Sequence, residues 1–503
     1  MQGERREPVV EWVAVTRSYR LTPWSPGRPA LECFSLRIAA GQMVAIFGAN
    51  GSGKSTALRI AAGLLRPTAG VCRLWGSERP DLTMNRKIGY VPDVCALPGF
   101  LTVGELLSVA ARLGGLGRVA EPDVAPDALT RVGLEGKAGH PVAGLSRGQA
   151  QRLGLAVALL RAPELLILDE PLSPLDDGGA ARMVALLAEL RADGCTVLLT
   201  AHRSPELTPH CDRMVWLADG RQVEERAQER GTNVAPGGLE AGRSPGRRSR
   251  GWGEIACLVR LRLRAAVRER LYLVALAAAG GVVSVAHGLR GWVAEADRWA
   301  LTLDLGMAAL SVAGGVLALI VTVNAWFTDV INGWGRGVLA TVVGRRRWLV
   351  VHALAAAVLA LGLCVVLVLA VMLASEDGEL TRGRVLRGSI ALGWWWLKLS
   401  AMAGIALGIA ALSRTPSTAM VGAAGVLLLG HLHPLMDLLA DGGGWSALGW
   451  NAGAMLLPDF SALEVSAEWI AEGVSAGPRL RLGEIGVLAG WAAVVYWRVS
   501  RRD

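Results

Sequence analysis

Residues 48–56 read Gly-Ala-Asn-Gly-Ser-Gly-Lys-Ser-Thr and fit the pattern G-x-x-x-x-G-K-[ST]. The apolar run before them, Met43–Phe47, predicts a buried strand, and the run Ser55–Leu65 predicts a helix. Glycine lets backbone N–H groups wrap phosphate oxygens without a Cβ in the way, and a helix N-terminus adds partial positive charge. The stretch therefore predicts a phosphate-binding loop between a strand and a helix.

The residue types of this loop also predict which atoms meet the ligand. Lys54 should reach the β- and γ-phosphates of a nucleoside triphosphate as a catalytic residue, and the Ser55 hydroxyl should bind Mg²⁺. The other nucleotide contacts predicted in the loop are Gly48, Asn50, Gly51, Ser52, Gly53 and Thr56.

A second apolar run, Leu165–Leu168, ends in two carboxylates, Asp169 and Glu170. We expect Asp169 to hold Mg²⁺ and Glu170 to polarise the attacking water as the catalytic base. Val197–Thr200 reads as another buried strand, and residues 8–225 alternate such runs with helical stretches and Gly/Pro turns. This alternation predicts an α/β domain with a parallel sheet.

Residues 8–225 resemble the ATP-binding subunit of ABC transporters. Besides the two phosphate motifs, Leu145–Gln149 (LSRGQ) resembles the family's LSGGQ signature, Ser173–Asp176 (SPLD) resembles its D-loop, and His202 resembles its switch histidine. The resemblance implies an ATP hydrolase that uses ATP and Mg²⁺. It further implies that two ATP are sandwiched between two subunits, the loop of one facing the signature of the other. The nucleotide contacts implied outside the loop are Ser146, Gly148, Gln149 and Asp176, and His202 is implied as a catalytic contact of the γ-phosphate.

Some positions are ambiguous or depart from the family pattern. Tyr19 lies upstream of the loop, where the family stacks an aromatic ring on adenine, but Trp12 and Trp24 are nearby alternatives. Arg147 replaces a Gly of the signature. Asp93 stands where the family usually has Gln, and because Asp keeps an oxygen ligand we predict that it contacts Mg²⁺.

The second half of the chain has a different composition. Residues 226–250 are rich in Gly, Pro, Arg and Ser and predict a flexible linker. The whole chain is 52% hydrophobic with a mean hydropathy of +0.39, which indicates membrane segments. Residues 251–503 are therefore predicted to form an all-α transmembrane permease domain with six spans, at about 271–289, 305–327, 348–374, 390–412, 417–433 and 483–499.

Charge and cysteine usage narrow the possible classes. Arg residues are more numerous on the predicted inner flanks than in the outer loops, which favours a multi-pass protein of the cytoplasmic membrane with the ATPase domain and the C-terminus in the cytoplasm. The net charge of +9 is then an excess on these flanks, and no nucleic-acid partner is expected. The seven Cys form no CxxC and no Cys/His cluster, which argues against a zinc module.

The order of the domains suggests a function. An ATPase domain followed by six spans resembles type-2 ABC exporters and pigment-type half-transporters, and the segment 329–347 resembles the cytoplasmic segment after the second span of type-2 permeases. We take this segment as the candidate for docking on the ATPase, and the alternative is an ordinary positively charged inner loop. We therefore expect an ATP-driven exporter in the lipid bilayer, working as a dimer with a second copy of itself or a paralogous half-transporter. The cargo is not indicated. The alternative is an ATP-driven transmembrane transmitter of signal or force without substrate flux.

Overall fold

The computed structural model divides into two compact units, and each is considered by itself. The first comprises Met1–Glu254 and Asp329–Gly344, and the second Ile255–Thr328 and Arg345–Asp503. The structure describes residues 8–19, 27–78, 84–95, 97–113, 121–202, 204–227, 252–268, 277, 280–281, 284, 288, 314–316, 318–327, 345–373, 382–413, 415–431, 460 and 492–493.

The first unit is built on a six-stranded sheet whose strand order is β5-β6-β7-β3-β8-β9. Five strands are parallel and β9 pairs antiparallel with β8. The strands are β3 (Met43–Gly48), β5 (Ile88–Val91), β6 (Leu165–Leu168), β7 (Thr196–Ala201), β8 (Arg213–Ala218) and β9 (Arg221–Ala227). The predicted strands at 43–47, 165–168 and 197–200 are confirmed, and each is buried throughout, as strands covered on both faces must be.

A smaller antiparallel sheet completes the β-structure of this unit, in the order β2-β1-β4. Its strands are β1 (Val10–Tyr19), β2 (Arg28–Ile38) and β4 (Ala69–Leu74). Trp12 of β1 and Phe34 of β2 pack edge to face, with ring centroids 5.5 Å apart. They belong to a core that also contains Val44 and Ile46 of the large sheet and Leu58 of α1.

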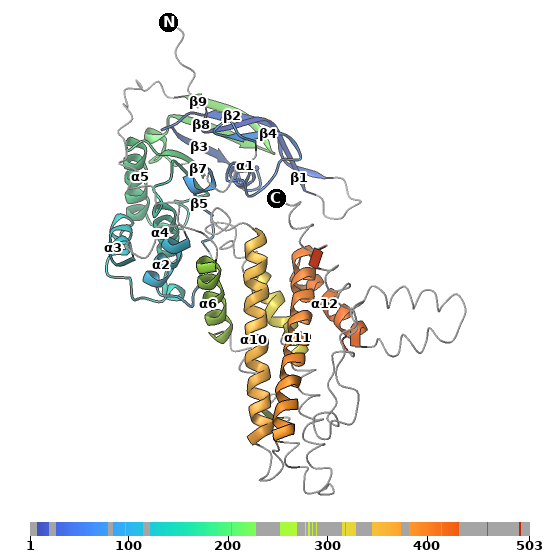
Figure 1. Cartoon of the computed structure of the whole chain (residues 1–503). Helices are drawn as coiled ribbons and strands as arrows, with labels where there is room; N and C mark the ends of the chain where they lie inside the picture. The colour runs from blue at the N-terminus through green and yellow to red at the C-terminus, as the bar shows by residue number, and fades with distance from the viewer. Residues whose placement is uncertain are drawn as a thin grey trace, which may run out of the picture. The chain divides into compact units, whose positions relative to one another are not determined.

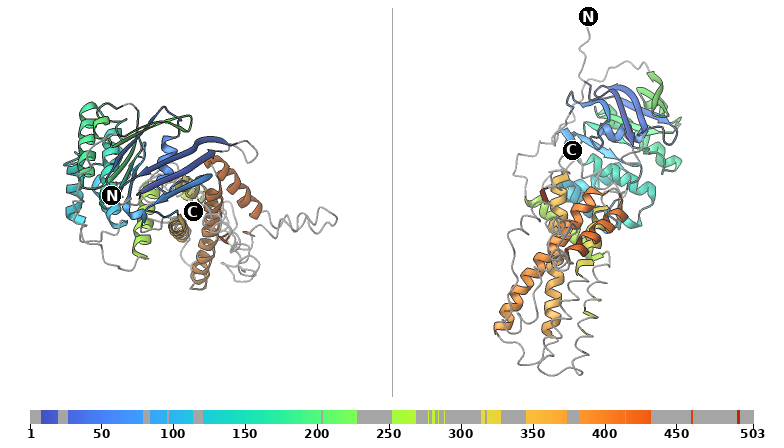
Figure 2. Two further views of the ribbon diagram at one scale, coloured as in Figure 1. Left: turned by 90° about the horizontal axis from the view of Figure 1, so that it is seen from above. Right: turned by 90° about the vertical axis from the view of Figure 1, so that its right-hand side faces the viewer.

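Helices cover the rest of the first unit. They are α1 (Lys54–Ala61), α2 (Val103–Leu113), α3 (Glu121–Arg131), α4 (Arg147–Leu159) and α5 (Asp177–Ala192), with 3₁₀ turns at Met84–Lys87, Val142–Gly144 and Thr208–His210. Figures 1 and 2 show α2, α3, α4 and α5 gathered at one side of this unit and β1, β2 and β4 at the other. The predicted α/β fold with a phosphate loop is therefore confirmed. The helix after the loop ends earlier than predicted, at Ala61. The last strand, β9, continues to Ala227, past the predicted domain end at residue 225 and into the predicted linker.

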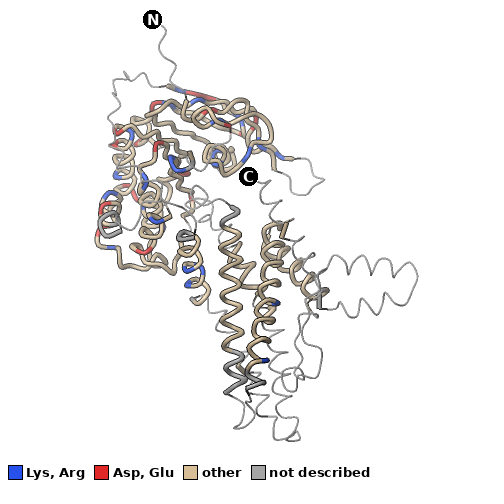
Figure 3. Tube along the Cα trace, in the orientation of Figure 1, with Lys and Arg blue, Asp and Glu red and all other residues tan. Residues whose placement is uncertain are grey.

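The second unit is helical where it is described. Its helices are α6 (Trp252–Arg268), α10 (Arg345–Leu373), α11 (Arg382–Leu412) and α12 (Pro416–His431). Two stretches of the described residues are long and apolar enough to cross a membrane, Trp348–Val366 and Leu386–Leu412, and two shorter apolar helices are Gly314–Phe327 and Pro416–Leu429. Figure 3 shows the contrast in charge: Lys, Arg, Asp and Glu are scattered over the first unit and are sparse on α10 and α11.

These helices fall on the predicted third, fourth and fifth spans and on part of the second. Most residues of the predicted first and sixth spans, of the linker and of the segment 329–347 lie outside the described residues. The count of six spans is not tested and stays a prediction.

Candidate active site

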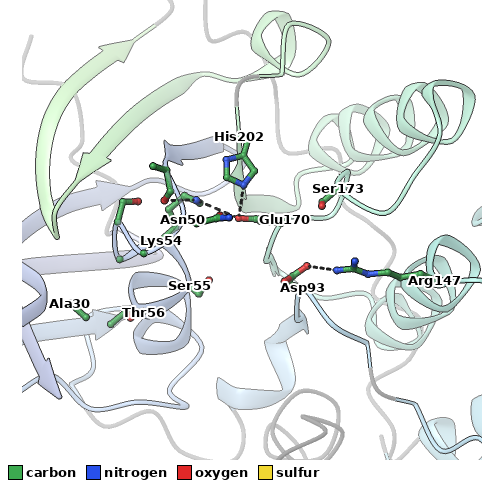
Figure 4. A pocket seen from close by; sticks show the side chains of 14 residues that line it. Ala30, Asn50, Lys54, Ser55, Thr56, Asp93, Arg147, Glu170, Ser173 and His202 are labelled. Carbon is green, nitrogen blue, oxygen red and sulfur yellow. Dashed lines mark hydrogen bonds and ion pairs between the residues drawn. The ribbon is translucent and has the colours of Figure 1, made fainter. Parts of the chain in front are cut away.

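The loop 48–56 requires glycine at the positions where the chain comes closest to itself. Gly53 has φ +102°, a conformation that other residues rarely adopt, and a Cβ there would lie 2.2 Å from the Ala30 carbonyl oxygen. A Cβ on Gly48 would lie 2.4 Å from the Leu217 carbonyl oxygen. The loop curls around one side of a cavity of about 530 Å³. The cavity is lined by Ala49–Thr56 and by Ala30, Asp93, Arg147, Glu170, Ser173 and His202 (Figure 4).

The loop presents a buried cation and an unsatisfied hydroxyl to this cavity. Lys54 is only 4% exposed, and its Nζ donates to the carbonyl oxygens of Gly48, at 2.7 Å, and Ala49, at 3.1 Å. The Ser52 hydroxyl is buried and has no hydrogen-bond partner among the described residues. A buried polar atom without a partner is costly. A phosphate oxygen would satisfy it, so the residues present fit the phosphates of a nucleotide.

Asp169 follows the last residue of β6 and contacts the loop at Ser55. It is 1% exposed, and its Oδ1 accepts hydrogen bonds from Ser55 Oγ, at 3.0 Å, and from Thr200 Oγ1, at 2.8 Å. Burial raises the pKa of Asp169, an effect that the bonds from Thr200 and Ser55 oppose. A desolvated carboxylate beside a serine hydroxyl is a pair of hard oxygen ligands, which fits Mg²⁺.

This pair would be a small share of a metal's coordination shell. Among the residues that the structure describes, no three or more His, Cys, Asp or Glu side chains group together to hold a metal ion. Mg²⁺ is usually bound by one or two protein oxygens with substrate phosphates and waters. The arrangement at Ser55 and Asp169 is of that kind.

Glu170 turns from the end of the strand into the cavity. Its backbone has φ +49°, which is strained for a residue with a side chain, and its N–H donates to Thr200 Oγ1 at 2.9 Å. Its Oε1 lies 3.4 Å from Lys54 Nζ and 3.3 Å from His202 Nε2. Figure 4 shows Lys54 and His202 both directed at this carboxylate. The structure thus joins Lys54, Glu170 and His202, the three residues predicted to be catalytic, in one cluster.

Thr200 is the member of this cluster that the sequence did not single out. Its side chain is fully buried, and its one hydroxyl serves both acidic residues, as donor to Asp169 and as acceptor for the Glu170 amide. A polar residue in the otherwise apolar run 197–201 was the available signal.

Of the signature residues 145–149, only Arg147 lines the cavity. Ser146 caps α4: its Oγ accepts from the Gln149 N–H at 3.3 Å, and the Gln149 side chain accepts from the Ser146 N–H at 3.1 Å. A Cβ on Gly148 would lie 2.9 Å from the Pro174 carbonyl oxygen, so this glycine lets α4 pack against the segment 173–176. Asp176 caps α5 by accepting from Gly179 N at 3.1 Å.

The aromatic residues considered as stacking partners for adenine differ in their exposure to solvent. Trp12 is 1% exposed and belongs to the core, so it is not available to a nucleotide. Trp24 lies outside the described residues. Tyr19 is 43% exposed at the end of β1, where the Arg17 guanidinium lies 5.1 Å from its ring centroid, but it is not among the residues that line the cavity.

Asp93 lines the cavity, as predicted for a metal contact, but in this structure it faces a cation of the protein. Arg147 Nη2 lies 3.4 Å from Asp93 Oδ1 (Figure 4). Two residues at which the sequence departs from the family pattern thus form an ion pair, which sequence reasoning did not anticipate.

Comparison with known proteins agrees with this geometry. The family model described as ABC transporter matches residues 31–173. The chain is 37% identical over 210 residues to an uncharacterized ABC transporter ATP-binding protein, YxlF, of Bacillus subtilis, covering 41% of this chain and 70% of that protein. It is 38% identical over 200 residues to the lipoprotein-releasing system ATP-binding protein LolD 1 of Caulobacter vibrioides, covering 38% of this chain and 85% of that protein.

Further similarity is to longer proteins and to solved structures. The chain is 35% identical over 214 residues to the macrolide export ATP-binding/permease protein MacB of Agrobacterium fabrum, covering 41% of this chain but only 33% of that protein. A dimeric ATP-binding cassette solved in a post-hydrolysis state with ADP and Pi is 29% identical with a TM-score of 0.40, covering 43% of this chain and 98% of that one.

Proposed function

The chain belongs to the ABC transporter family through its ATP-binding domain, an ATP-hydrolysing module, and from that premise we propose that it is an ATP-driven exporter in which this domain is fused to a six-span permease of the type-2 class. The observation that carries the ATPase part of the proposal is the cluster of Lys54, Glu170 and His202 at a cavity that the loop 48–56 lines on one side.

Each residue of the cluster has a chemical role that follows from its position. The Glu170 carboxyl group is held between Lys54 and His202, and we assign it as the base that polarises the attacking water. Lys54, released from the loop carbonyls, binds the β- and γ-phosphates. His202 donates to Glu170 or to the γ-phosphate from its half-exposed ring.

Ser55 and Asp169 would hold Mg²⁺. When bound, the ion neutralises charge that develops on the phosphates. Thr200 fixes the orientation of Asp169 and the backbone of Glu170. Both carboxyl groups therefore keep their positions when Lys54 exchanges the loop carbonyl oxygens for phosphate oxygens.

A second subunit would complete the site. Ser146 is exposed at the N-terminus of α4 and outside its own cavity. Its Oγ already accepts from the Gln149 N–H, so the hydroxyl proton is free to be donated to a phosphate oxygen of a nucleotide held by the partner. The Gly148 N–H and the positive end of α4 add to the attraction. Two ATP would thus be bound between opposite subunits.

The permease part of the proposal is supported by the second unit and by the relatives. Trp348–Val366 and Leu386–Leu412 have the length and apolarity of membrane spans. Several relatives similar to the ATPase domain are named export ATP-binding/permease proteins, among them MacB of Agrobacterium fabrum and a probable export protein of Pseudomonas fluorescens. We propose a multi-pass location in the cytoplasmic membrane, with the ATPase domain inside and the segment 329–347 as its docking site.

The test uses the full-length protein purified in detergent and in proteoliposomes. Lys54→Ala should abolish ATP hydrolysis because the phosphates lose their cation. Glu170→Gln should bind ATP, fail to turn it over and accumulate as a dimer in size-exclusion chromatography. Glu164→Gln, which alters an exposed ion pair with Lys87 outside the cavity, is the control and should behave as wild type.

Three outcomes would contradict parts of this proposal. Turnover retained by Lys54→Ala would remove the ATPase mechanism. A Glu170→Gln protein that stays monomeric with ATP would remove the sandwich. Hydrolysis that depends on an outside partner protein, with no compound moved across the bilayer, would replace export by transmission of a conformational signal.

A further inference from the structure

Two residues that depart from the family pattern meet in the lining of the cavity. Asp93 follows β5 in the segment 91–95, and Arg147 is the first residue of α4. Arg147 Nη2 and Asp93 Oδ1 are 3.4 Å apart, and both residues line the cavity together with the loop 48–56. Where the family resemblance leads one to expect a neutral amide and a glycine, this chain has a negative and a positive charge.

Packing of α4 against the segment 91–95 holds the pair in place. The Gln151 side chain donates to the Pro92 carbonyl oxygen at 3.2 Å. A Cβ on Gly154 would lie 2.5 Å from Cys95 Sγ, so the thiol occupies the hollow that this glycine leaves. Positions 147, 151 and 154 are spaced as neighbours on one face of a helix. Three successive contacts therefore align this face of α4 with the segment that carries Asp93.

The negative charge of Asp93 opposes the binding of a triphosphate in this cavity. A carboxylate on the cavity wall repels the phosphates, and at a separation of several ångströms in a partly desolvated site this repulsion weakens binding by between about threefold and about a hundredfold. Arg147 is 64% exposed and Asp93 41% exposed, so their attraction alone adds little to folding. The position of the pair favours a different role, in which Arg147 compensates the negative charge of Asp93 inside the cavity.

We propose that Arg147 is a positioning residue of its own subunit's ATP site: it neutralises Asp93 and turns that carboxylate away from the phosphates. In this chain one residue of the signature therefore serves the nucleotide in cis, in addition to the contacts that Ser146 and Gly148 make with the partner. The inference rests on the assignment of the cavity to ATP.

A double-mutant cycle on the full-length protein tests this role. The variants are Arg147→Gln, Asp93→Asn, the double variant and Arg147→Lys. Their equilibrium Kd for a fluorescent ATP analogue with Mg²⁺ and their KM and kcat for ATP are measured. Lys87→Gln is the matched control, because it breaks an ion pair of similar exposure with Glu164 outside the cavity. Thermal unfolding without nucleotide confirms that each variant is folded.

The proposal predicts a particular pattern of coupling. Arg147→Gln should raise Kd and KM about tenfold, equivalent to about 1.4 kcal/mol, with a smaller change in kcat, since it leaves the charge of Asp93 uncompensated. Asp93→Asn should change Kd less than threefold. The double variant should return to within about threefold of wild type, and Arg147→Lys should stay near it. Raising the ionic strength should shrink the defect of Arg147→Gln.

Other patterns would overturn it. If Arg147→Gln binds ATP as wild type does, Arg147 compensates nothing. If the double variant is as defective as Arg147→Gln, the arginine acts without Asp93. If Asp93→Asn alone raises the Mg²⁺ concentration needed for half-maximal binding about tenfold, Asp93 is a metal contact instead. Failure of the wild-type protein to bind MgATP would refute the proposed function itself, which separates the two results.

Discussion

Replacing Thr200 with valine would remove a single hydroxyl from the centre of the site while leaving almost the same volume. The side chain is fully buried in β7, where it donates to Asp169 Oδ1 at 2.8 Å and accepts from the Glu170 N–H at 2.9 Å. Valine keeps both branches of the side chain and the strand preference, so the change acts through the two hydrogen bonds. Both acidic residues are affected at once.

The size of the effect can be worked out from these two bonds. A hydrogen bond to a charged group contributes about 1.5–3 kcal/mol, and a buried N–H left without a partner costs about 1–3 kcal/mol. Asp169 keeps its bond from Ser55, so the terms do not add in full. We expect the free energy of unfolding to fall by about 2–4 kcal/mol. Because the strained Glu170 backbone loses its anchor, kcat should fall at least about tenfold, which requires only about 1.4 kcal/mol at the transition state.

The assay compares Thr200→Val with Thr200→Ser in the full-length protein. Serine restores the hydroxyl and lacks only the methyl group, so it controls for packing. ATP turnover at saturating MgATP and thermal unfolding without nucleotide are measured for both. The reasoning is refuted if Thr200→Val matches Thr200→Ser in both measurements, since the hydroxyl would then organise neither carboxylate.

Two further predictions test neighbouring contacts. Gly148→Ala places a Cβ 2.9 Å from the Pro174 carbonyl oxygen and should lower the free energy of unfolding by about 1–3 kcal/mol. The control is Gly178→Ala in α5, where a Cβ has room, and it should be neutral or stabilising. Equal unfolding temperatures for the two variants would contradict the packing argument. Asp169→Asn should raise the unfolding temperature of the nucleotide-free protein at neutral pH, because burial raises the pKa of Asp169 and its ionised form therefore destabilises the fold. That gain should shrink as the pH falls through the raised pKa and Asp169 takes up its proton; a gain that grows in acid would show that another group controls it.

Local sequence pattern was enough to predict the elements that carry the chemistry. The loop 48–56, the strand before it and the apolar strand that ends in Asp169 and Glu170 all have their signals within about ten residues, and the structure has strands at these places. The helix limits were less accurate, because α1 ends at Ala61 although the apolar pattern continues to Leu65. Helix ends depend on capping and packing that periodicity does not report.

The contacts that could not be predicted all join segments distant in the chain. Thr200 meets Asp169 across 31 positions, and Arg147 meets Asp93 across 54. Trp12 was a plausible partner for adenine by position alone, and only its packing against Phe34 assigns it to the core. Each of these outcomes depends on which strands are neighbours and on which face of a helix meets them. A single sequence without long-range pairing information does not specify either.

The strand order explains why four separate motifs share one cavity. In the order β5-β6-β7-β3 all four strands are parallel, so their carboxyl ends lie at the same edge of the sheet. Directly after these ends come Asp93, Glu170, His202 and, one loop later, Lys54. Because β6 lies between β5 and β7, Glu170 emerges between Asp93 and His202, and because β3 is the next strand after β7, the loop returns Lys54 to within 3.4 Å of the Glu170 carboxylate. Any change that moved β6 out of this order would separate Glu170 from both Lys54 and His202 while leaving every motif intact in the sequence.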